Sequence, residues 1–423
     1  MTARKFLEKH QMYYEQMPMA QLRQAYRQDM EAALRGEKSS VMMLPSFLRS
    51  DAEPARGEQV LMIDAGGTNL RAGLGHFEPD GSVQVDALKK RRMPGTDEPV
   101  EAEEMFRQIA AFALEYAGEA RRACISFSYA FDSLPDGDGR IVRLCKELQV
   151  RHAEGAPICA SLETELQRMG APGSRSWRAI NDSVGSLLGG MAGAARGSYD
   201  DYIGFILGTG TNACCCLPSA WVTKSPAAMA MGGETIVNTE SGCFDRLLRG
   251  TADRILDAAS ELPGDHIAEK MVSGSYYKQL LRETLLLACR EGILSPEARD
   301  RISTLHFTSA LVDQFCKDPH GDNPIARALP AAREQDFANE LNLALLERAA
   351  RVAAGCLCAI LDMRALQPGS RVCVCADGTM LRKNPVLLPR MEAVMAAEHP
   401  EISTSFRFVE DATILGCAWA ALI

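Results

Sequence analysis

Short apolar runs alternate with longer stretches of helical periodicity along most of the chain. The short runs predict strands at 60–63, 72–77, 123–128, 141–144, 177–180, 202–207, 213–217, 371–375 and 406–409. The periodic stretches predict mainly helical segments at 4–36, 102–117, 158–169, 184–195, 243–261, 264–291, 336–365, 384–398 and 413–423. Strands that alternate with helices in this way predict an α/β protein.

One arrangement occurs twice along the chain. A strand, a turn rich in glycine and threonine, and a return strand span 60–77, and the same order recurs at 202–217. Two such turns in two halves suggest a duplicated α/β architecture with a ligand between the halves. A chain of 423 residues also favours two domains over one.

Charge and hydropathy exclude some classes of partner. The formal net charge of −9 makes nucleic acid and anionic lipid poor partners. A nucleotide remains possible, because backbone amides and Mg²⁺ can supply local positive charge. No stretch of apolar residues is long enough for a membrane-spanning helix, and the first 40 residues have no signal-like apolar core. We therefore expect a cytoplasmic protein that binds neither nucleic acid nor membrane.

The 14 cysteines allow two interpretations. Many lie inside apolar runs, such as Cys214 to Cys216, which favours small buried hydrophobic residues. A structural zinc site is the alternative, but such sites usually show matched pairs of closely spaced ligands. A disulfide framework is not expected in a chain of this length without a secretion signal.

The first turn, Asp64-Ala-Gly-Gly-Thr-Asn69, has the composition of an anion-binding loop. Gly66 and Gly67 let the backbone approach a phosphate, and Thr68 and Asn69 add neutral donors. The Asp64 carboxylate is suited to water on Mg²⁺. An ordinary Gly-Gly hairpin is the alternative interpretation.

The second turn, Gly208-Thr-Gly-Thr-Asn-Ala213, formally fits the dinucleotide fingerprint. That fingerprint requires a helix directly after the turn, whereas the strand-like Ala213–Leu217 follows here. A second phosphate hairpin explains the sequence better. The chain has no G-x-x-x-x-G-K-[ST], which excludes a P-loop kinase on motif grounds.

Two further segments carry polar groups suited to chemistry on a hydroxyl. Asp182 follows the predicted strand 177–180 and could accept a proton from a substrate, or it could instead cap the next helix. Asn238 and Glu240 lie two apart, so on an extended segment their side chains face the same way. They could hold a sugar, or the segment could be a solvated loop.

In this order the segments resemble the hexokinase family, the eukaryotic-type sugar kinases of the actin-like ATPase superfamily. The blocks that carry the resemblance are 41–47 (VMMLPSF), 64–71 (DAGGTNLR), 126–127 with 141–146, 179–185 (AINDSVG), 203–214 (IGFILGTGTNAC), 237–244 (VNTESGCF), 269–276 (EKMVSGSY) and 375–379 (CADGT). They extend over nearly the whole chain. A single block of this kind is weak evidence, and all of them in one order are strong evidence.

The resemblance implies a role for each matching residue. Asp182 would be the general base toward the sugar 6-hydroxyl, with Lys146 beside it. The sugar would be held by Ser126, Asn181, Asn212, Glu240 and Gln279. ATP would be surrounded by Asp64, Gly66, Gly67, Thr68, Asn69, Arg71, Gly208, Thr209, Gly210, Asp377, Gly378 and Thr379. Mg²⁺ would be bound, through water, at Asp64 and Asp182.

The implied fold is α/β, with two ribonuclease-H-like (actin-like ATPase) domains and a cleft between them. Residues 58–183 would form the small domain and 184–423 the large domain, with a C-terminal helix that could return to the small one. Residues 1–57 would be an N-terminal helix and lead-in packed on the large domain. The implied activity is ATP-dependent phosphorylation of a hexose, glucose as the first guess, by a monomer or homodimer.

Four residues depart from the family pattern: Cys145, Ser128, Ser241 and Gln279. The last replaces an expected glutamate, so a higher KM or a shifted sugar preference is expected. Gln279, Cys145 and Ser128 motivate a second hypothesis, a catalytically weak sugar-sensing or regulatory protein on the same fold. A third, the bacterial repressor/kinase type of glucokinase, carries a compact zinc motif whose spacing this chain lacks.

Overall fold

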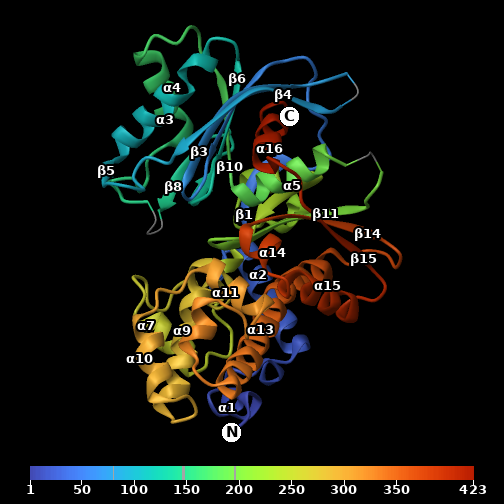
Figure 1. Ribbon diagram of the computed structural model, residues 1–423. Coiled ribbons are helices and arrows are strands. Elements are labelled where there is room, and N and C mark those ends of the chain that lie inside the picture. The colour runs from blue at the N-terminus through green and yellow to red at the C-terminus, as the bar shows by residue number, and fades with distance from the viewer. Residues whose placement is uncertain (80, 145–147, 195–196) are drawn as a thin grey trace.

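The computed structural model describes residues 1–79, 81–144, 148–194 and 197–423. The chain forms two lobes, each built on a mixed β-sheet with helices against it (Figure 1). The predicted α/β class is thereby confirmed.

The smaller lobe contains a sheet with strand order β10-β6-β2-β3-β4. Its strands are β2 (Val60–Ala65), β3 (Asn69–Phe77), β4 (Val83–Arg92), β6 (Arg122–Phe127) and β10 (Ser176–Ile180). Strands β10, β6 and β2 run parallel, whereas β3 and β4 are antiparallel to their neighbours. Helices α3 (Ala102–Ala117) and α4 (Ile158–Arg168) share a hydrophobic core with one face of this sheet.

The apolar run in β2 is continuous because both faces of the sheet are covered. Leu61 and Ile63 pack in the core with α3 and α4, while Val60 and Met62 pack in a different core on the opposite face. Successive side chains of a strand point to opposite faces, so a strand covered twice needs apolar residues at every position.

The larger lobe repeats the same strand arrangement. Its sheet has the order β1-β13-β12-β11-β14-β15, in which β11 and β12 form the antiparallel hairpin and β14 and β15 add in parallel. The strands are β1 (Leu44–Arg49), β11 (Asp201–Leu207), β12 (Thr211–Pro218), β13 (Glu234–Asn238), β14 (Arg371–Asp377) and β15 (Ser403–Arg407). The hairpins β2–β3 and β11–β12 correspond to the repeat expected from the sequence.

Two helices lie between the sheets. Helix α5 (Asp182–Ala192) packs on β11 and β14, and α16 (Ala412–Ala421) packs on β2, β6 and β10. The two helices also pack on one another, and they share one hydrophobic core with both sheets (Figure 1). The C-terminal helix therefore lies against the sheet of the smaller lobe.

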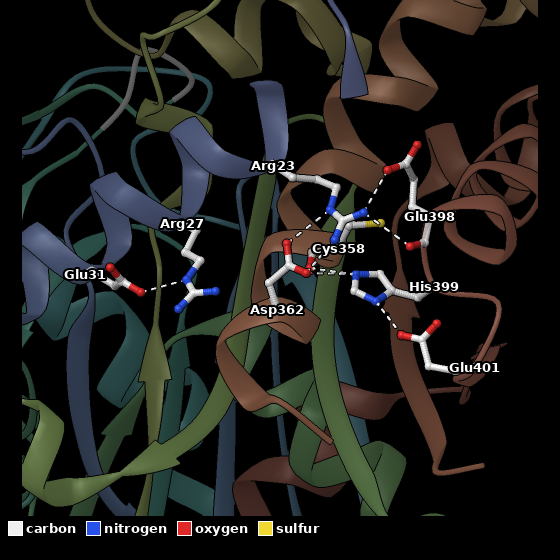
Figure 2. A network of polar contacts seen from close by, with 8 residues as sticks. All are labelled: Arg23, Arg27, Glu31, Cys358, Asp362, Glu398, His399 and Glu401. Atoms are coloured by element: carbon white, nitrogen blue, oxygen red, sulfur yellow. Dashed lines mark hydrogen bonds and ion pairs between the residues drawn. The ribbon is translucent and has the colours of Figure 1, made fainter. Parts of the chain in front are cut away.

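The N-terminal helices α1 (Ala3–Lys9) and α2 (Met19–Arg35) belong to the core of the larger lobe. In α2, Arg23 Nε donates to Asp362 Oδ2 at 3.0 Å, and Arg23 Nη1 donates to Glu398 Oε2 at 2.7 Å. Figure 2 shows this network, with His399 Nε2 3.3 Å from Asp362 Oδ1. These contacts tie α2 to the long helix α13 and to the end of α15.

The remaining elements are short strands and the helices of the larger lobe. The small ladders pair β5 (Val100–Glu101) with β9 (Val150–Arg151) and β7 (Ala130–Ser133) with β8 (Gly139–Arg143). The helices are α6 (Pro226–Met229), α7 (Thr251–Ala258), α8 (Ile267–Val272), α9 (Gly274–Arg290), α10 (Pro296–Thr304), α11 (Ser309–Lys317), α12 (Pro324–Ala328), α13 (Ala332–Arg364), α14 (Thr379–Lys383) and α15 (Leu387–Glu398).

Three predicted elements differ from the structure. The helix expected over 4–36 is interrupted before α2, which begins after Pro18. The helix expected over 264–291 is two helices, because the Gly274 amide leaves the helix pattern and donates to Gly208 O at 2.8 Å. In 243–261 the described α-helix is restricted to Thr251–Ala258.

The described cysteines support their interpretation as small buried hydrophobic residues. All of them except Cys289 and Cys316 are buried, as expected of small hydrophobic residues.

Among the residues that the structure describes, none of the helices combines the length and apolar character that a membrane crossing requires.

Candidate active site

The carboxyl ends of three parallel strands bring the first group of predicted residues to one edge of the smaller sheet. Asp64 at the end of β2 is in register with Ser126 on β6, and Ser126 is in register with Ile180 on β10. Asn181 and Asp182 follow Ile180 directly. The sheet register therefore places the carboxylate of Asp64 near the start of α5.

Asn181, and not Asp182, caps helix α5. Its Oδ1 accepts hydrogen bonds from Ser183 N at 2.9 Å and from Ser183 Oγ at 2.7 Å. The capping interpretation of Asp182 is wrong, and its carboxylate is available for other contacts.

The environment of Asp182 raises the pKa of its carboxyl to about 7. Desolvation is the largest cause, and the negative charges of Glu240 and Asp64 add to it, while a hydrogen bond from the Ser128 hydroxyl opposes it. A carboxylate with a pKa near neutral pH has the property expected of a general base.

Amide and carboxylate groups from the larger sheet form a hydrogen-bonded cluster beside Asn181. Asn212 Nδ2 lies 2.8 Å from Asn238 Oδ1, 3.2 Å from Asn181 Oδ1 and 3.4 Å from Glu240 Oε1. Asn238 Nδ2 donates to Glu240 Oε1 at 2.7 Å. Burial raises the pKa of Glu240 against the opposing hydrogen bonds from Asn238 and Asn212.

This cluster is suited to a ligand rich in hydroxyl groups. Glu240 holds a left-handed backbone conformation, with φ of 52°, which is uncommon for a residue other than glycine. Within the described part of the chain, the Ser126 hydroxyl is buried and has no hydrogen-bond partner. Since each sugar hydroxyl both donates and accepts, a bound sugar could satisfy it.

At the first glycine turn, Arg71 links the hairpin to helix α16. Its Nη2 donates to Asp64 Oδ2 at 2.8 Å and to Thr413 Oγ1 at 2.7 Å, and Nη1 pairs with Asp411. Thr68 and Asn69 are exposed at the tip of the turn. The Arg71 guanidinium therefore connects the hairpin of the first turn to the start of α16.

The second turn meets the Asp377-Gly-Thr segment and the start of α9. Gly378 has φ of 120°, and a Cβ atom there would lie 2.2 Å from Leu207 O, so only glycine fits. Asp377 Oδ1 accepts from Gly378 N at 2.7 Å and pairs with Arg382 Nη2 at 3.1 Å. A small pocket adjoins this segment, lined by Gly274, Tyr277, Lys278, Ser309, Val312, Asp313 and Met380.

The donor set fits Mg²⁺. Oxygen ligands are those that Mg²⁺ prefers, and Asp64 and Asp182 lie close enough for their charges to interact. Arg71 takes one oxygen of Asp64, Oδ2, through two hydrogen bonds. The other oxygen, Oδ1, could face a metal-bound water.

Gln279, the remaining residue expected to hold the sugar, lies on α9 outside the hydrogen-bonded cluster, and its role in sugar binding stays a prediction. Gln279 is exposed on α9, and its side-chain amide donates to Ser275 O at 3.4 Å in the same helix. Glu269 on α8 lies at the second glycine turn, where its Oε2 accepts from Thr211 N at 3.1 Å. The sequence analysis includes this glutamate in a matching block without assigning it a role.

Exchanging the charge at Gln279 and at Glu269 tests which of the two side chains contributes to sugar binding. Glu269→Gln is expected to lower kcat/KM for the sugar about tenfold, because a hydrogen bond to a charged group becomes a neutral one. Gln279→Glu is expected to leave kcat/KM within about twofold, because exposed substitutions away from a site have small effects. Steady-state kinetics on both variants is the measurement, and the opposite ranking would return Gln279 to the site.

The other predicted residues are placed as follows. Lys146 and Cys145 lie outside the described residues. Ser241 is buried and hydrogen-bonds Cys356, so this departure from the family pattern faces the core of the larger lobe.

The ligand atoms of Cys243, Asp265 and His266 lie within 4.8 Å of one another. Arg143 already pairs with Asp265, at 2.6 Å, and supplies positive charge there.

Fold and site together define a two-lobed α/β protein, and comparison with known proteins gives its family. Two family models, both described as hexokinase, match residues 3–192 and 202–423. The chain belongs to the hexokinase family.

Curated relatives and solved structures agree with this assignment. The chain is 28% identical to the hexokinase-like 1 protein of Arabidopsis thaliana, over 79% of this chain and 73% of that protein. It is 26% identical to mouse hexokinase-3, over 96% of this chain but only 45% of that protein, so it spans about half of some relatives. A hexokinase from Schistosoma mansoni complexed with glucose matches with a TM-score of 0.81 and 22% identity, over 100% of this chain and 99% of that one. This match confirms the fold of two actin-like ATPase domains.

Proposed function

We propose that the protein transfers a phosphoryl group from ATP to the 6-hydroxyl of a hexose, with glucose as the first candidate. The observation that carries this proposal is Asp182, a carboxyl with a pKa of about 7 between Asp64 of the smaller sheet and Glu240 of the larger one. Asp64 adjoins the first glycine turn, and Glu240 belongs to an amide cluster suited to a sugar.

In this mechanism the protein aligns groups and moves one proton. Asn212, Asn238 and Glu240 hold the sugar hydroxyls, and Ser126 receives a further hydrogen bond. Asp182 accepts the proton of the attacking hydroxyl as the new O–P bond forms and the bond between the γ-phosphorus and the β,γ-bridging oxygen breaks, which releases ADP. Phosphoryl transfer needs little covalent help from protein, so positioning supplies most of the rate enhancement.

The two glycine turns are proposed to hold the nucleotide. The turn at Gly66 and Gly67 and the turn at Gly208 and Gly210 offer backbone amides, and the segment 377–379 beside the second turn would contact the adenosine. Asp64 and Asp182 would hold Mg²⁺ through water, and the ion when bound neutralises phosphate charge.

A panel of sugars tests the proposed function. The full chain is assayed with Mg²⁺-ATP and glucose, mannose or fructose, and ADP release is coupled to NADH oxidation. We expect saturable turnover with at least one of these hexoses and formation of its 6-phosphate. Absence of ADP release with every sugar would refute catalysis.

A sugar-sensing protein is the second candidate. The departures at Ser128, Cys145 and Gln279 favour it, as does similarity to a relative named hexokinase-like. Calorimetric sugar binding without ADP release would support this candidate, whereas turnover above about 1 s⁻¹, the low end of typical enzymes, would rule it out.

The pH dependence of turnover follows from Asp182. A general base must be ionised to accept a proton, and with a pKa of about 7 its ionised fraction rises as the pH rises through 7. We therefore expect kcat/KM for the sugar, at saturating ATP, to increase about tenfold per pH unit below 7 and to level off above it. A profile that is flat between pH 6 and 8 would contradict this assignment.

A further inference from the structure

An ion pair joins the two lobes beside the proposed sugar cluster. Arg143 ends strand β8 of the smaller lobe, and Asp265 precedes helix α8 of the larger lobe, 122 residues further along the chain. Arg143 Nη2 lies 2.6 Å from Asp265 Oδ2, and the two side chains are 34% and 35% exposed.

Other charged and titratable groups of the larger lobe face this pair. His266 Nδ1 lies 3.0 Å from Asp265 Oδ1, and burial lowers the pKa of His266. The positive charge of Arg143 acts on Glu240 and Cys243, and Lys270 acts on His266. The pair is therefore within electrostatic reach of Glu240, one of the proposed sugar ligands.

The strand that carries Arg143 belongs to a hairpin anchored in the smaller lobe. Phe131 on β7 and Ile141 on β8 pack in the core of that lobe with Ile158 of α4. On the other side, Glu269 of α8 contacts the second glycine turn through Thr211 N. The ion pair of Arg143 at the end of β8 with Asp265, two residues before α8 begins, therefore links this hairpin of the smaller lobe to the segment of the larger lobe that contacts the second turn.

We propose that Arg143 and Asp265 are positioning residues that stabilise the closed arrangement of the two lobes over the sugar. The proposal rests on the proposed function for its substrate. Because the pair needs both lobes in contact, its free energy favours only the closed arrangement and appears in sugar affinity. Neither residue takes part in proton transfer, so kcat is affected less than KM.

Uncharged, nearly isosteric variants test the pair. Arg143→Gln and Asp265→Asn are each expected to raise the sugar KM about 3–10-fold, the effect of a partly exposed ion pair and its lost hydrogen bond, with kcat within about twofold. The double variant is expected to match the single variants, because the second substitution removes an interaction already lost. Arg107→Gln, which breaks an exposed pair with Glu104 inside α3, is the matched control and should change neither constant.

A second measurement keeps the test independent of catalysis. Small-angle X-ray scattering at saturating sugar is expected to show a larger radius of gyration for Arg143→Gln and Asp265→Asn than for the parent protein and for Arg107→Gln. If the parent protein shows no turnover, the proposed function fails and the scattering comparison, made without sugar, still tests the pair. Multiplicative effects in the double variant, or an unchanged KM and radius in both single variants, would overturn the proposal.

Discussion

Replacing Asp182 by asparagine is expected to lower kcat by about 10²–10⁴-fold, the usual range for a positioned general base. The amide keeps the shape of the side chain at the first turn of α5 but cannot accept the proton of a sugar hydroxyl. The capping hydrogen bonds of that helix come from Asn181, so they remain in the variant. Turnover measured at saturating sugar and ATP is the direct check.

The stability of this variant separates chemistry from folding. Desolvation raises the pKa of Asp182 to about 7, which means that its ionised form is disfavoured by the fold. A neutral asparagine avoids this cost, so we expect the thermal midpoint at pH 8 to equal or exceed that of the parent protein. A stable variant with nearly unchanged kcat would remove Asp182 from the mechanism.

Replacing Gly189 by alanine is expected to destabilise the protein by about 1–3 kcal/mol, the usual cost of overpacking a core. A Cβ atom at Gly189 of α5 would lie 2.1 Å from Ala412 O, and one at Gly416 of α16 would lie 2.0 Å from Gly185 O. Both obstacles are backbone oxygens, which cannot rotate away, so the helices must separate. The urea midpoint of unfolding measures this loss.

The same variant is expected to lose activity although it touches no ligand. Asp182 begins α5 and Thr413 of α16 bonds Arg71, so a shift between the helices displaces Asp182 relative to Asp64. A displacement of about 1 Å can cost about 10²-fold in rate. Gly193→Ala is the control, since a Cβ there would meet its nearest neighbours at 3.5 Å. Equal stability and activity in the Gly189→Ala and Gly193→Ala variants would show that the close packing of α5 on α16 determines neither stability nor activity.

The sequence predicts the centre of each sheet better than its edges. The runs at Val60–Ala65 and Asp201–Leu207 are apolar because both sheet faces are covered, so they are recognisable as strands. The edge strand β4 ends in Lys89-Lys-Arg-Arg92 and has no apolar run. Lys89 there pairs with Glu115 and lies over the rings of Phe112 and Tyr116, contacts that no local pattern indicates.

The sequence locates a candidate site residue most directly where the residue lies next to a recognisable strand, and least directly where the geometry of helices decides its position. Asp64, Asn181 and Asn212 each lie at a strand end, and the structure brings them to the site. The prediction for Gln279 rests on its place in a block that resembles the family, within a segment expected to be one helix. The break between α8 and α9 leaves Gln279 exposed and leaves Glu269 against the second turn, because Gly274 bonds to Gly208 O.

The position of α16 has a consequence for how the chain acquires its structure during synthesis. The face of the smaller sheet formed by Val60, Met62 and Cys124 is covered by residues 412–421, which are made more than two hundred residues after β10. Until those residues leave the ribosome, that face stays open to water or to a chaperone. Contacts between such distant segments slow folding, so the smaller lobe, although it is translated early, completes its core last.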